Sequence, residues 1–118
     1  MKVTKVLVVD DFPAFQRMFT DLVKGIFGEG VIVLVASTLD EATKLFEENK
    51  SELDLILLDT SLGDGVYTYQ LAKTMRKVFS RPIVGTSTDE KHRELMVKFG
   101  CTHSCNKTEV GDLLKKWK

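Results

Sequence analysis

Strand-like and helix-like segments alternate along the whole chain, and this alternation limits the possible folds more than any other feature of the sequence. Apolar runs predict five strands, over residues 3–9, 31–36, 53–58, 82–87 and 102–105. Apolar residues at helical spacing after each run predict five helices, joined to the strands by short connections. Five successive β/α units predict one parallel sheet with helices packed on both faces.

Such a sheet defines the flavodoxin-like, doubly wound α/β class, with five parallel strands in the order 2-1-3-4-5. The third strand, Leu53 to Leu58, is almost continuously apolar, as expected for a strand covered on both faces. The chain has 118 residues, enough for one hydrophobic core and too few for two. We therefore expect residues 1–118 to form a single domain.

Several helix ends are marked by residues that favour them. Thr38 and Glu41 match a capping box at the start of the second helix, and the third helix is predicted over residues 66–79. Either Thr88 or Asp89 is expected to cap the fourth helix. The residues that this fourth helix should bury are Leu95, Met96 and Phe99.

Composition and charge exclude several classes of function. Seventeen Lys and Arg residues balance seventeen Asp and Glu residues, so the net charge gives no reason to expect nucleic-acid binding. No apolar run approaches the roughly 20 residues that cross a bilayer, and no signal peptide precedes the first strand. We expect a cytoplasmic protein whose partner is another protein or a small ligand, with no membrane contact.

The segment from Cys101 through His103 to Cys105 can be interpreted in two ways. Its three donor side chains could bind a metal ion, but no clear fourth ligand accompanies them. Alternate positions of a strand would instead bury two small thiols, and free cysteine is commonly buried. We favour two buried thiols, and we assign no catalytic role to His103 or to His92.

Acidic, hydroxyl and basic residues follow the predicted strands where they end. These residues are Asp10 and Asp11, Asp59, Ser87 and Lys107, after the first, third, fourth and fifth strands respectively. The carboxyl ends of parallel strands share the edge of the sheet where ligands bind. Carboxylates crowded there repel each other, a pair about 4 Å apart by roughly 4 kcal/mol at an effective dielectric constant of about 20. Mg²⁺ relieves such repulsion and prefers carboxylate oxygens, so it is the expected cofactor.

Each of these residues alone has a simpler explanation. An acid near a helix N-terminus stabilises the helix by about 0.3–1 kcal/mol, so Asp10 and Asp11 could serve only the following helix. Lys107 could be a solvated loop residue, and Ser87 could cap a helix. A cap needs one acid, however, and not two with a third on another strand. The joint pattern therefore favours a site.

The residues at this edge suit phosphoryl transfer. An aspartate carboxylate is a nucleophile towards an activated phosphoryl group, and a metal ion with a lysine would neutralise the phosphoryl oxygens. Asp59 stands alone at the end of the central strand, whereas the adjacent pair Asp10 and Asp11 is better suited to holding the ion. We therefore expect an acyl phosphate to form on Asp59.

In four segments, the chain resembles the receiver domains of two-component response regulators, and the resemblance covers its whole length. The segments are VLVVDD, LDLILLDTSLGDG, PIVGTS and FGCTHSCNK. The resemblance implies that Asp59 accepts a phosphoryl group from a phosphohistidine on a sensor histidine kinase or a histidine phosphotransfer protein. Ser87 would then move towards that group, and Lys107 would bind its oxygens. The face formed by the fourth helix, fifth strand and fifth helix would rearrange and bind a downstream effector protein.

The resemblance also assigns the metal site. Asp11 and Asp59 would bind Mg²⁺ directly, Asp10 would act mainly through water, and the backbone carbonyl of Ser61 would complete the site. A domain of this kind is not an enzyme with a separate substrate, since it promotes only its own phosphorylation and dephosphorylation.

Four positions differ from what is usual in the family. Gly63 replaces a proline, which predicts a more mobile loop after the third strand, and Thr108 replaces the proline that fixes the turn after the lysine. Ser104 occupies the place of the aromatic residue that moves together with the hydroxyl. Thr88 replaces a smaller residue, which predicts crowding beside the phosphoryl group.

Two other functions compete with the phosphoryl acceptor. A pseudo-receiver would bind partners without phosphorylation; the four substitutions favour it, and the intact acids and lysine oppose it. A flavin-binding electron carrier of the same fold would need a phosphate loop after the first strand, where Asp10 and Asp11 would repel the phosphate. The chain ends eleven residues after Lys107, so we expect no attached output domain.

Overall fold

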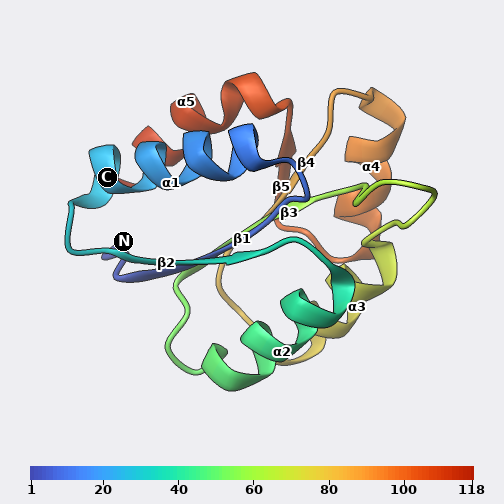
Figure 1. Cartoon of the computed structure of the whole chain (residues 1–118), viewed down its shortest axis with the longest axis horizontal. Coiled ribbons are helices and arrows are strands. Elements are labelled where there is room, and N and C mark those ends of the chain that lie inside the picture. The colour runs from blue at the N-terminus through green and yellow to red at the C-terminus, as the bar shows by residue number, and fades with distance from the viewer.

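The computed structural model describes all residues from 1 to 118 (Figure 1). Its strands are β1 (Lys5–Val9), β2 (Ile32–Ala36), β3 (Leu55–Asp59), β4 (Ile83–Thr86) and β5 (His103–Cys105). Its helices are α1 (Pro13–Phe27), α2 (Leu39–Asn49), α3 (Tyr69–Val78), α4 (Glu90–Phe99) and α5 (Val110–Lys115), with a short 3-10 helix at Lys107–Glu109. None of these helices combines the length and the apolar character that crossing a membrane requires.

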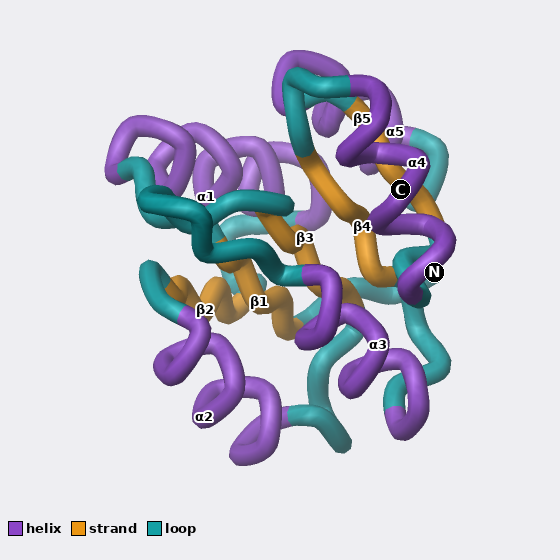
Figure 2. The backbone as a smooth tube through the Cα atoms, turned by 90° about the vertical axis from the view of Figure 1, so that its right-hand side faces the viewer, coloured by secondary structure: helices purple, strands orange, loops and turns teal.

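All five strands pair in parallel in one sheet, in the order β2-β1-β3-β4-β5. Helices α1 and α5 cover one face of the sheet, while α2, α3 and α4 cover the other (Figure 1). Figure 2 shows the strands between α1 on one side and α2 and α3 on the other. The doubly wound α/β fold and the strand order predicted from the sequence are confirmed.

Alternate residues of the central strands supply two separate cores. In β1, Val6 and Val8 belong to the core beneath α1 and α5, whereas Leu7 and Val9 belong to the core beneath the other three helices. Every residue of β3 is buried, as its continuous apolar run predicted. The two cores hold the central strands firmly and so fix the positions of the residues that follow them.

Two local predictions are wrong. The third helix begins at Tyr69 rather than at residue 66, because the preceding residues fold back on the strand end: Ser61 and Tyr67 form an antiparallel bridge. Leu95 and Phe99 were expected to be buried, yet 37% of Leu95 is exposed and Phe99 is only half-buried, because Met96 is the α4 residue that fills the core. The first and third strands also begin two residues later than predicted, at Lys5 and Leu55.

The predicted residues Thr38 and Asp89 cap α2 and α4, but one hydrogen bond of the predicted capping box goes to a different residue. Thr38 Oγ1 accepts the N–H of Glu41, but the Glu41 carboxylate accepts the N–H of Ser37 instead of that of Thr38. The predicted capping box is therefore half formed. At α4 the cap is Asp89 and not Thr88, since the Asp89 carboxylate accepts an N–H of the first helical turn.

The two cysteines lie in different layers. Cys101 is buried in the core beneath α2, α3 and α4, whereas Cys105 packs against the core beneath α1 and α5. Burial raises the pKa of Cys101 to about 12 and that of Cys105 to about 11. Thiols on opposite faces of the sheet cannot bind one ion, so the metal interpretation is wrong; Cys101 is buried as predicted, whereas Cys105 is only half-buried.

Asp54 lies just before β3, at the edge of the sheet where the strands begin. Its carboxylate accepts the N–H and the hydroxyl of Thr4 at 2.7 and 2.9 Å, the N–H of Lys5 at 3.2 Å and a guanidinium N–H of Arg81 at 2.8 Å. Burial by itself would raise the pKa of Asp54, but these donors outweigh it and hold that pKa below its ordinary value. The carboxylate ties the N-terminal segment and the approach to β4 onto the central strand.

Candidate functional site

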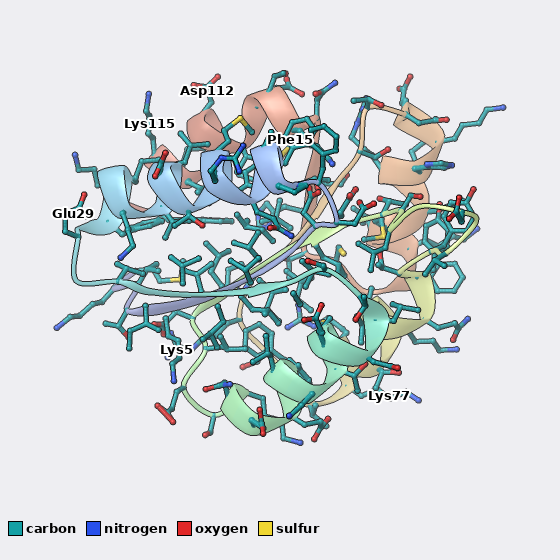
Figure 3. The ribbon with its side chains drawn as sticks, in the orientation of Figure 1. Lys5, Phe15, Glu29, Lys77, Asp112 and Lys115 are labelled. Carbon is teal, nitrogen blue, oxygen red and sulfur yellow. The ribbon has the colours of Figure 1, made fainter.

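Three carboxylates meet where β1 and β3 end. Oxygen atoms of Asp10, Asp11 and Asp59 all lie within 4.8 Å of one another. Phe15 marks this end of the sheet at the start of α1, and Lys5 marks the opposite end (Figure 3). The cluster therefore occupies the edge where a doubly wound sheet binds its ligands.

Asp10 and Asp11 are neighbours in the chain but differ in their surroundings. Asp10 is fully buried; its Oδ1 accepts the N–H of Phe12 at 2.9 Å, and its Oδ2 accepts a proton of Lys107 Nζ at 2.9 Å. Asp11 is exposed, and its carboxylate accepts no hydrogen bond from the protein. A cation therefore finds free oxygens on Asp11 and occupied ones on Asp10, which fits direct binding by Asp11 and a supporting role for Asp10.

Lys107 joins two of the carboxylates. Its Nζ lies 2.9 Å from Asp10 Oδ2 and 3.1 Å from Asp59 Oδ2, and it stands 4.2 Å from the centre of the Phe15 ring. Burial would lower the pKa of this ammonium group, but its hydrogen bond to the Asp10 carboxylate and the charge of Asp59 raise that pKa above its ordinary value. Lys107 thus stays positively charged at the centre of the site.

Asp59 has a raised pKa. Burial and then the charge of Asp10 raise its pKa from the ordinary 3.8 to about 6, although the charge and hydrogen bond of Lys107 and the N–H of Ser61 oppose this rise. One ammonium group therefore does not compensate for the crowded carboxylates. The missing positive charge is what a bound divalent cation would supply.

A cavity of about 580 Å³ opens over the cluster. Its lining includes two carboxylates and the lysine of the cluster, hydroxyls of the β4–α4 loop and three aromatic rings: Asp11, Asp59, Lys107, Ser61, Gly63, Ser87, Thr88, Asp89, Phe12, Phe15 and His92. Ser87 is 7% exposed, and its Oγ accepts the N–H of Asp89 at 3.0 Å. Its own hydrogen remains able to donate to an oxygen in the cavity.

The loop after β3 is built around Gly63. This residue has φ +82°, a conformation that proline cannot adopt, and an added Cβ would lie 3.3 Å from Asp11 Oδ2. The amide N–H of Val66 donates to the carbonyl of Gly63 at 2.8 Å, which closes a turn. Glycine in place of the family's usual proline therefore permits a different turn that brings the loop close to the exposed acid.

The turn that carries Lys107 is fixed without a proline. Asn106 Oδ1 accepts the N–H and the hydroxyl of Thr108 at 3.1 and 3.2 Å, and a Glu109 carboxylate oxygen accepts the N–H of Asn106 at 3.2 Å. These bonds form a capping box around the start of the short 3-10 helix. The capping box supplies a restraint that the sequence did not suggest.

The donor set fits Mg²⁺. The cluster offers hard carboxylate oxygens within one small volume, which suits Mg²⁺ and does not suit metals that prefer sulfur or imidazole ligands. Three carboxylates and one ammonium group carry a net charge of about minus two at neutral pH, which one divalent cation balances. Ser61 also lines the cavity, where its carbonyl is a candidate further ligand.

All six residues predicted for the site lie at this edge of the sheet. Five of them line the cavity, and Asp10 is buried directly beneath it. The sequence prediction missed His92, which lines the cavity from the first turn of α4, and Thr68, whose hydroxyl donates to the carbonyl of Asp59 at 2.6 Å. His92 follows the cap of α4 by three residues, a spacing that could have placed it near the site. Thr86, beside Asp59 in the sheet, has a buried hydroxyl with no partner.

Several of the solved structures that resemble this chain are receiver domains. The BeF3-activated N-terminal receiver domain of RstA from Klebsiella pneumoniae is 22% identical, with a TM-score of 0.78 over 97% of this chain and 95% of that one. The signal receiver domain of a DNA binding response regulator protein (merR) from Colwellia psychrerythraea 34H is 15% identical, with a TM-score of 0.79 over 97% of each chain.

A third similar structure is the signal receiver domain of a modulated diguanylate cyclase from Desulfovibrio desulfuricans G20, which is 16% identical. Its TM-score is 0.77, over 97% of this chain and 89% of that one. No protein-family model matches the chain, and no curated protein matches it in sequence. These likenesses show that the chain has the fold of response-regulator receiver domains.

Proposed function

We propose that this chain is a signal receiver domain that accepts a phosphoryl group on Asp59 with the help of Mg²⁺. One observation carries the proposal: Asp59 lies within 4.8 Å of two further carboxylates and 3.1 Å from Lys107, at the ligand edge of a receiver fold. A structural carboxylate is surrounded by enough donors to satisfy it. Asp59 is not, and its surroundings suit a nucleophile that meets a metal-bound phosphoryl group.

The proposed step is the transfer of a phosphoryl group from a phosphohistidine to Asp59. A carboxylate oxygen of Asp59 attacks the phosphorus atom; an O–P bond forms, the P–N bond breaks, and the departing imidazole keeps the electron pair and takes up a proton. Bound Mg²⁺ would neutralise charge on the phosphoryl oxygens. Asp11 and Asp59 would hold the ion, with Asp10 behind them and the Ser61 carbonyl beside them.

The remaining residues would stabilise the product. Lys107 already carries a proton and lies beside Asp59, so its ammonium group can move to the phosphoryl oxygens once the carboxylate charge has been used in the bond. The Ser87 hydroxyl lines the same cavity and can donate to another of these oxygens. No separate substrate is converted, so the chain acts as a switch or relay and not as a conventional enzyme.

The partners follow from this chemistry. The phosphoryl donor would be a sensor histidine kinase or a histidine phosphotransfer protein, and a downstream effector protein would read the phosphorylated state. The face of α4, β5 and α5 is the proposed effector surface. It holds a polar cavity of about 350 Å³ lined by residues of all three elements, among them Arg93 of α4, Ser104 of β5 and Asp112 of α5.

A pseudo-receiver is the second candidate, and two features favour it. Gly63 changes the loop that closes the site, and Ser104 removes the ring that would move with Ser87. Such a domain would keep the fold and bind its partner in the absence of phosphorylation. The two functions differ in one chemical event, which can be measured.

That event is the gain of a phosphoryl group from a small donor. Acetyl phosphate with Mg²⁺ is expected to add one phosphoryl group to the intact mass of the wild-type protein, and to add none when Mg²⁺ is removed by a chelator. The Asp59→Asn variant should gain no phosphoryl group. The Asp54→Asn variant is the matched control and should gain one phosphoryl group, as the wild type does. Absence of any adduct in the wild type, together with absence of Mg²⁺ binding, would establish the pseudo-receiver instead.

A further inference from the structure

Aromatic rings form a contact between the β3–α3 loop and α4. Tyr67 and Tyr69 stack with their centroids 5.7 Å apart, and the imidazole of His92 meets the two tyrosine rings edge-on at 5.7 and 6.4 Å. Tyr69 also contacts Phe99, near the end of α4, at 5.4 Å. We call Tyr67, Tyr69 and His92 the loop–helix ring cluster.

On the loop side, the ring cluster is tied to the strand end that carries Asp59. Tyr67 forms a backbone bridge with Ser61, which follows Asp59 by two residues. The next residue, Thr68, donates its hydroxyl to the Asp59 carbonyl at 2.6 Å and lies 3.7 Å from the sulfur of Met96 on α4. The strand end at Asp59 is therefore connected to the ring cluster by the hydrogen bond of Thr68 and by the backbone bridge between Ser61 and Tyr67.

On the helix side, the ring cluster is tied to Ser87. The Ser87 Oγ accepts the N–H of Asp89, and the Ser87 carbonyl accepts a guanidinium N–H of Arg93 at 3.0 Å. In the sequence, His92 lies between Asp89 and Arg93, the two residues that Ser87 contacts. Its side chain lines the same cavity as Ser87 and Asp59. Movement of Ser87 into the cavity would strain these two bonds, which connect it to the first turn of α4 that carries His92.

The contacts described belong to the unphosphorylated arrangement. Lys107 is ion-paired with a free Asp59 carboxylate, and the Ser87 oxygen is occupied by Asp89. A contact formed in one of two states stabilises that state relative to the other. On the other side of α4, Ser104 of β5 contributes no ring to the connection with Ser87.

We propose that the loop–helix ring cluster is a brake on activation. It holds α4 against the β3–α3 loop while Asp59 is unphosphorylated, and movement of Ser87 towards a phosphoryl group separates His92 from the tyrosine rings. The connection between the site and α4 thus runs through the β3–α3 loop instead of through β5. This inference rests on the proposed function and states how the same site is regulated.

The brake predicts that removing a ring makes activation easier. We would titrate the protein with beryllofluoride in the presence of Mg²⁺ and follow the backbone amide resonances of residues 90–99 by NMR. His92→Leu and Tyr67→Leu should each bind beryllofluoride more tightly, by a factor of about 2 to 10, which is the worth of one aromatic contact. The double variant should gain no more than His92→Leu alone, because that substitution already removes the contact between His92 and Tyr67.

Two further variants control the experiment. Val78→Ala shortens an exposed apolar side chain at the end of α3, outside the cavity and outside the proposed effector surface, and should leave the beryllofluoride affinity unchanged. His92→Gln removes the ring but keeps a polar side chain at this half-buried position, and should behave like His92→Leu. Thermal unfolding of each variant checks that the fold is retained.

The outcomes separate the brake from the proposed function. If the wild type binds beryllofluoride and the Tyr67 and His92 variants bind it equally or less tightly, the brake is refuted and the receiver function stands. If the gains of the two single variants add in full in the double variant, the contact between them is not the brake. If the wild type binds no beryllofluoride and gains no phosphoryl group, the receiver function fails and the brake fails with it.

Discussion

The two ends of β3 carry the same side chain in opposite surroundings. Asp54, just before the strand, accepts hydrogen bonds from two backbone N–H groups, a hydroxyl and a guanidinium group, and its pKa is lowered. Asp59, at the other end, faces a second buried carboxylate and shares one ammonium group with it, and its pKa rises to about 6. Burial is common to both, so the supply of donors decides which carboxylate stabilises the fold and which one needs a cation.

The difference has a simple origin in the sheet. At the amino edge, Asp54 meets N–H groups that the strands leave free, together with Arg81. At the carboxyl edge the nearest groups are carboxylates, and Lys107 is shared between two of them. A structural role for Asp54 and a chemical role for Asp59 therefore predict opposite responses to mutation, to pH and to Mg²⁺.

The largest expected effect is opposite changes in stability when each carboxylate is neutralised. At pH 7 without Mg²⁺, Asp54→Asn should lower the free energy of unfolding by about 3 kcal/mol, because charged hydrogen bonds are lost. Asp59→Asn should raise it by up to about 3 kcal/mol, the worth of a pKa raised from 3.8 to about 6. Urea unfolding of both variants measures the two changes. A loss of stability in both variants would show that the carboxylates at the two ends of β3 stabilise the fold in the same way.

The pH dependence of stability sharpens the same comparison. The folded protein holds the Asp59 proton up to a pKa of about 6, whereas the unfolded chain releases it near 3.8, so the Asp59 contribution falls as the pH rises through this window. The lowered pKa of Asp54 acts in the other direction, since its contribution is present above the ordinary pKa and is lost at lower pH.

The measurement is the difference in unfolding free energy between Asp59→Asn and the wild type, without Mg²⁺. This difference should be near zero below about pH 3 and approach roughly 3 kcal/mol at about pH 7. For Asp54→Asn the loss of stability should shrink towards low pH. A difference for Asp59→Asn that stays flat with pH would contradict the raised pKa.

Mg²⁺ should stabilise the protein through one end of β3 only. At ten times the Kd, bound Mg²⁺ adds about 1.4 kcal/mol to the free energy of unfolding. Asp11→Asn should remove this gain while changing the stability without Mg²⁺ only slightly, because Asp11 is exposed and accepts no hydrogen bond from the protein. Asp54→Asn is the control and should keep the gain. If Asp11→Asn still shows the full gain, the ion binds elsewhere.

The sequence predicted the layout of the sheet and its ligand edge because both follow from simple patterns. The alternation of strand and helix fixes the order of elements; Asp10 directly follows β1, Asp59 is the last residue of β3, and Lys107 comes two residues after β5. Their meeting at one edge is a consequence of parallel strands. The acidic cluster and its lysine could therefore be located before the structure was known.

The β3–α3 loop could not be predicted in the same way. Its turn depends on a positive φ at Gly63 and on a bridge between Ser61 and Tyr67, neither of which has a periodic signature. The late start of α3 and the cavity position of His92 both follow from this loop and its packing on α4. Exposure of Leu95 has a similar cause, since the close fit of Met96 over Gly85 sets which face of α4 is buried.

The most direct test of the central claim is to find which residue carries the phosphoryl group. After treatment with acetyl phosphate and Mg²⁺, borohydride reduces an acyl phosphate to the alcohol, so the modified aspartate becomes homoserine and can be located by peptide mass spectrometry. We predict homoserine at position 59 and unmodified aspartate at positions 10, 11 and 54. Homoserine at any of those three positions, with position 59 unmodified, would contradict the account.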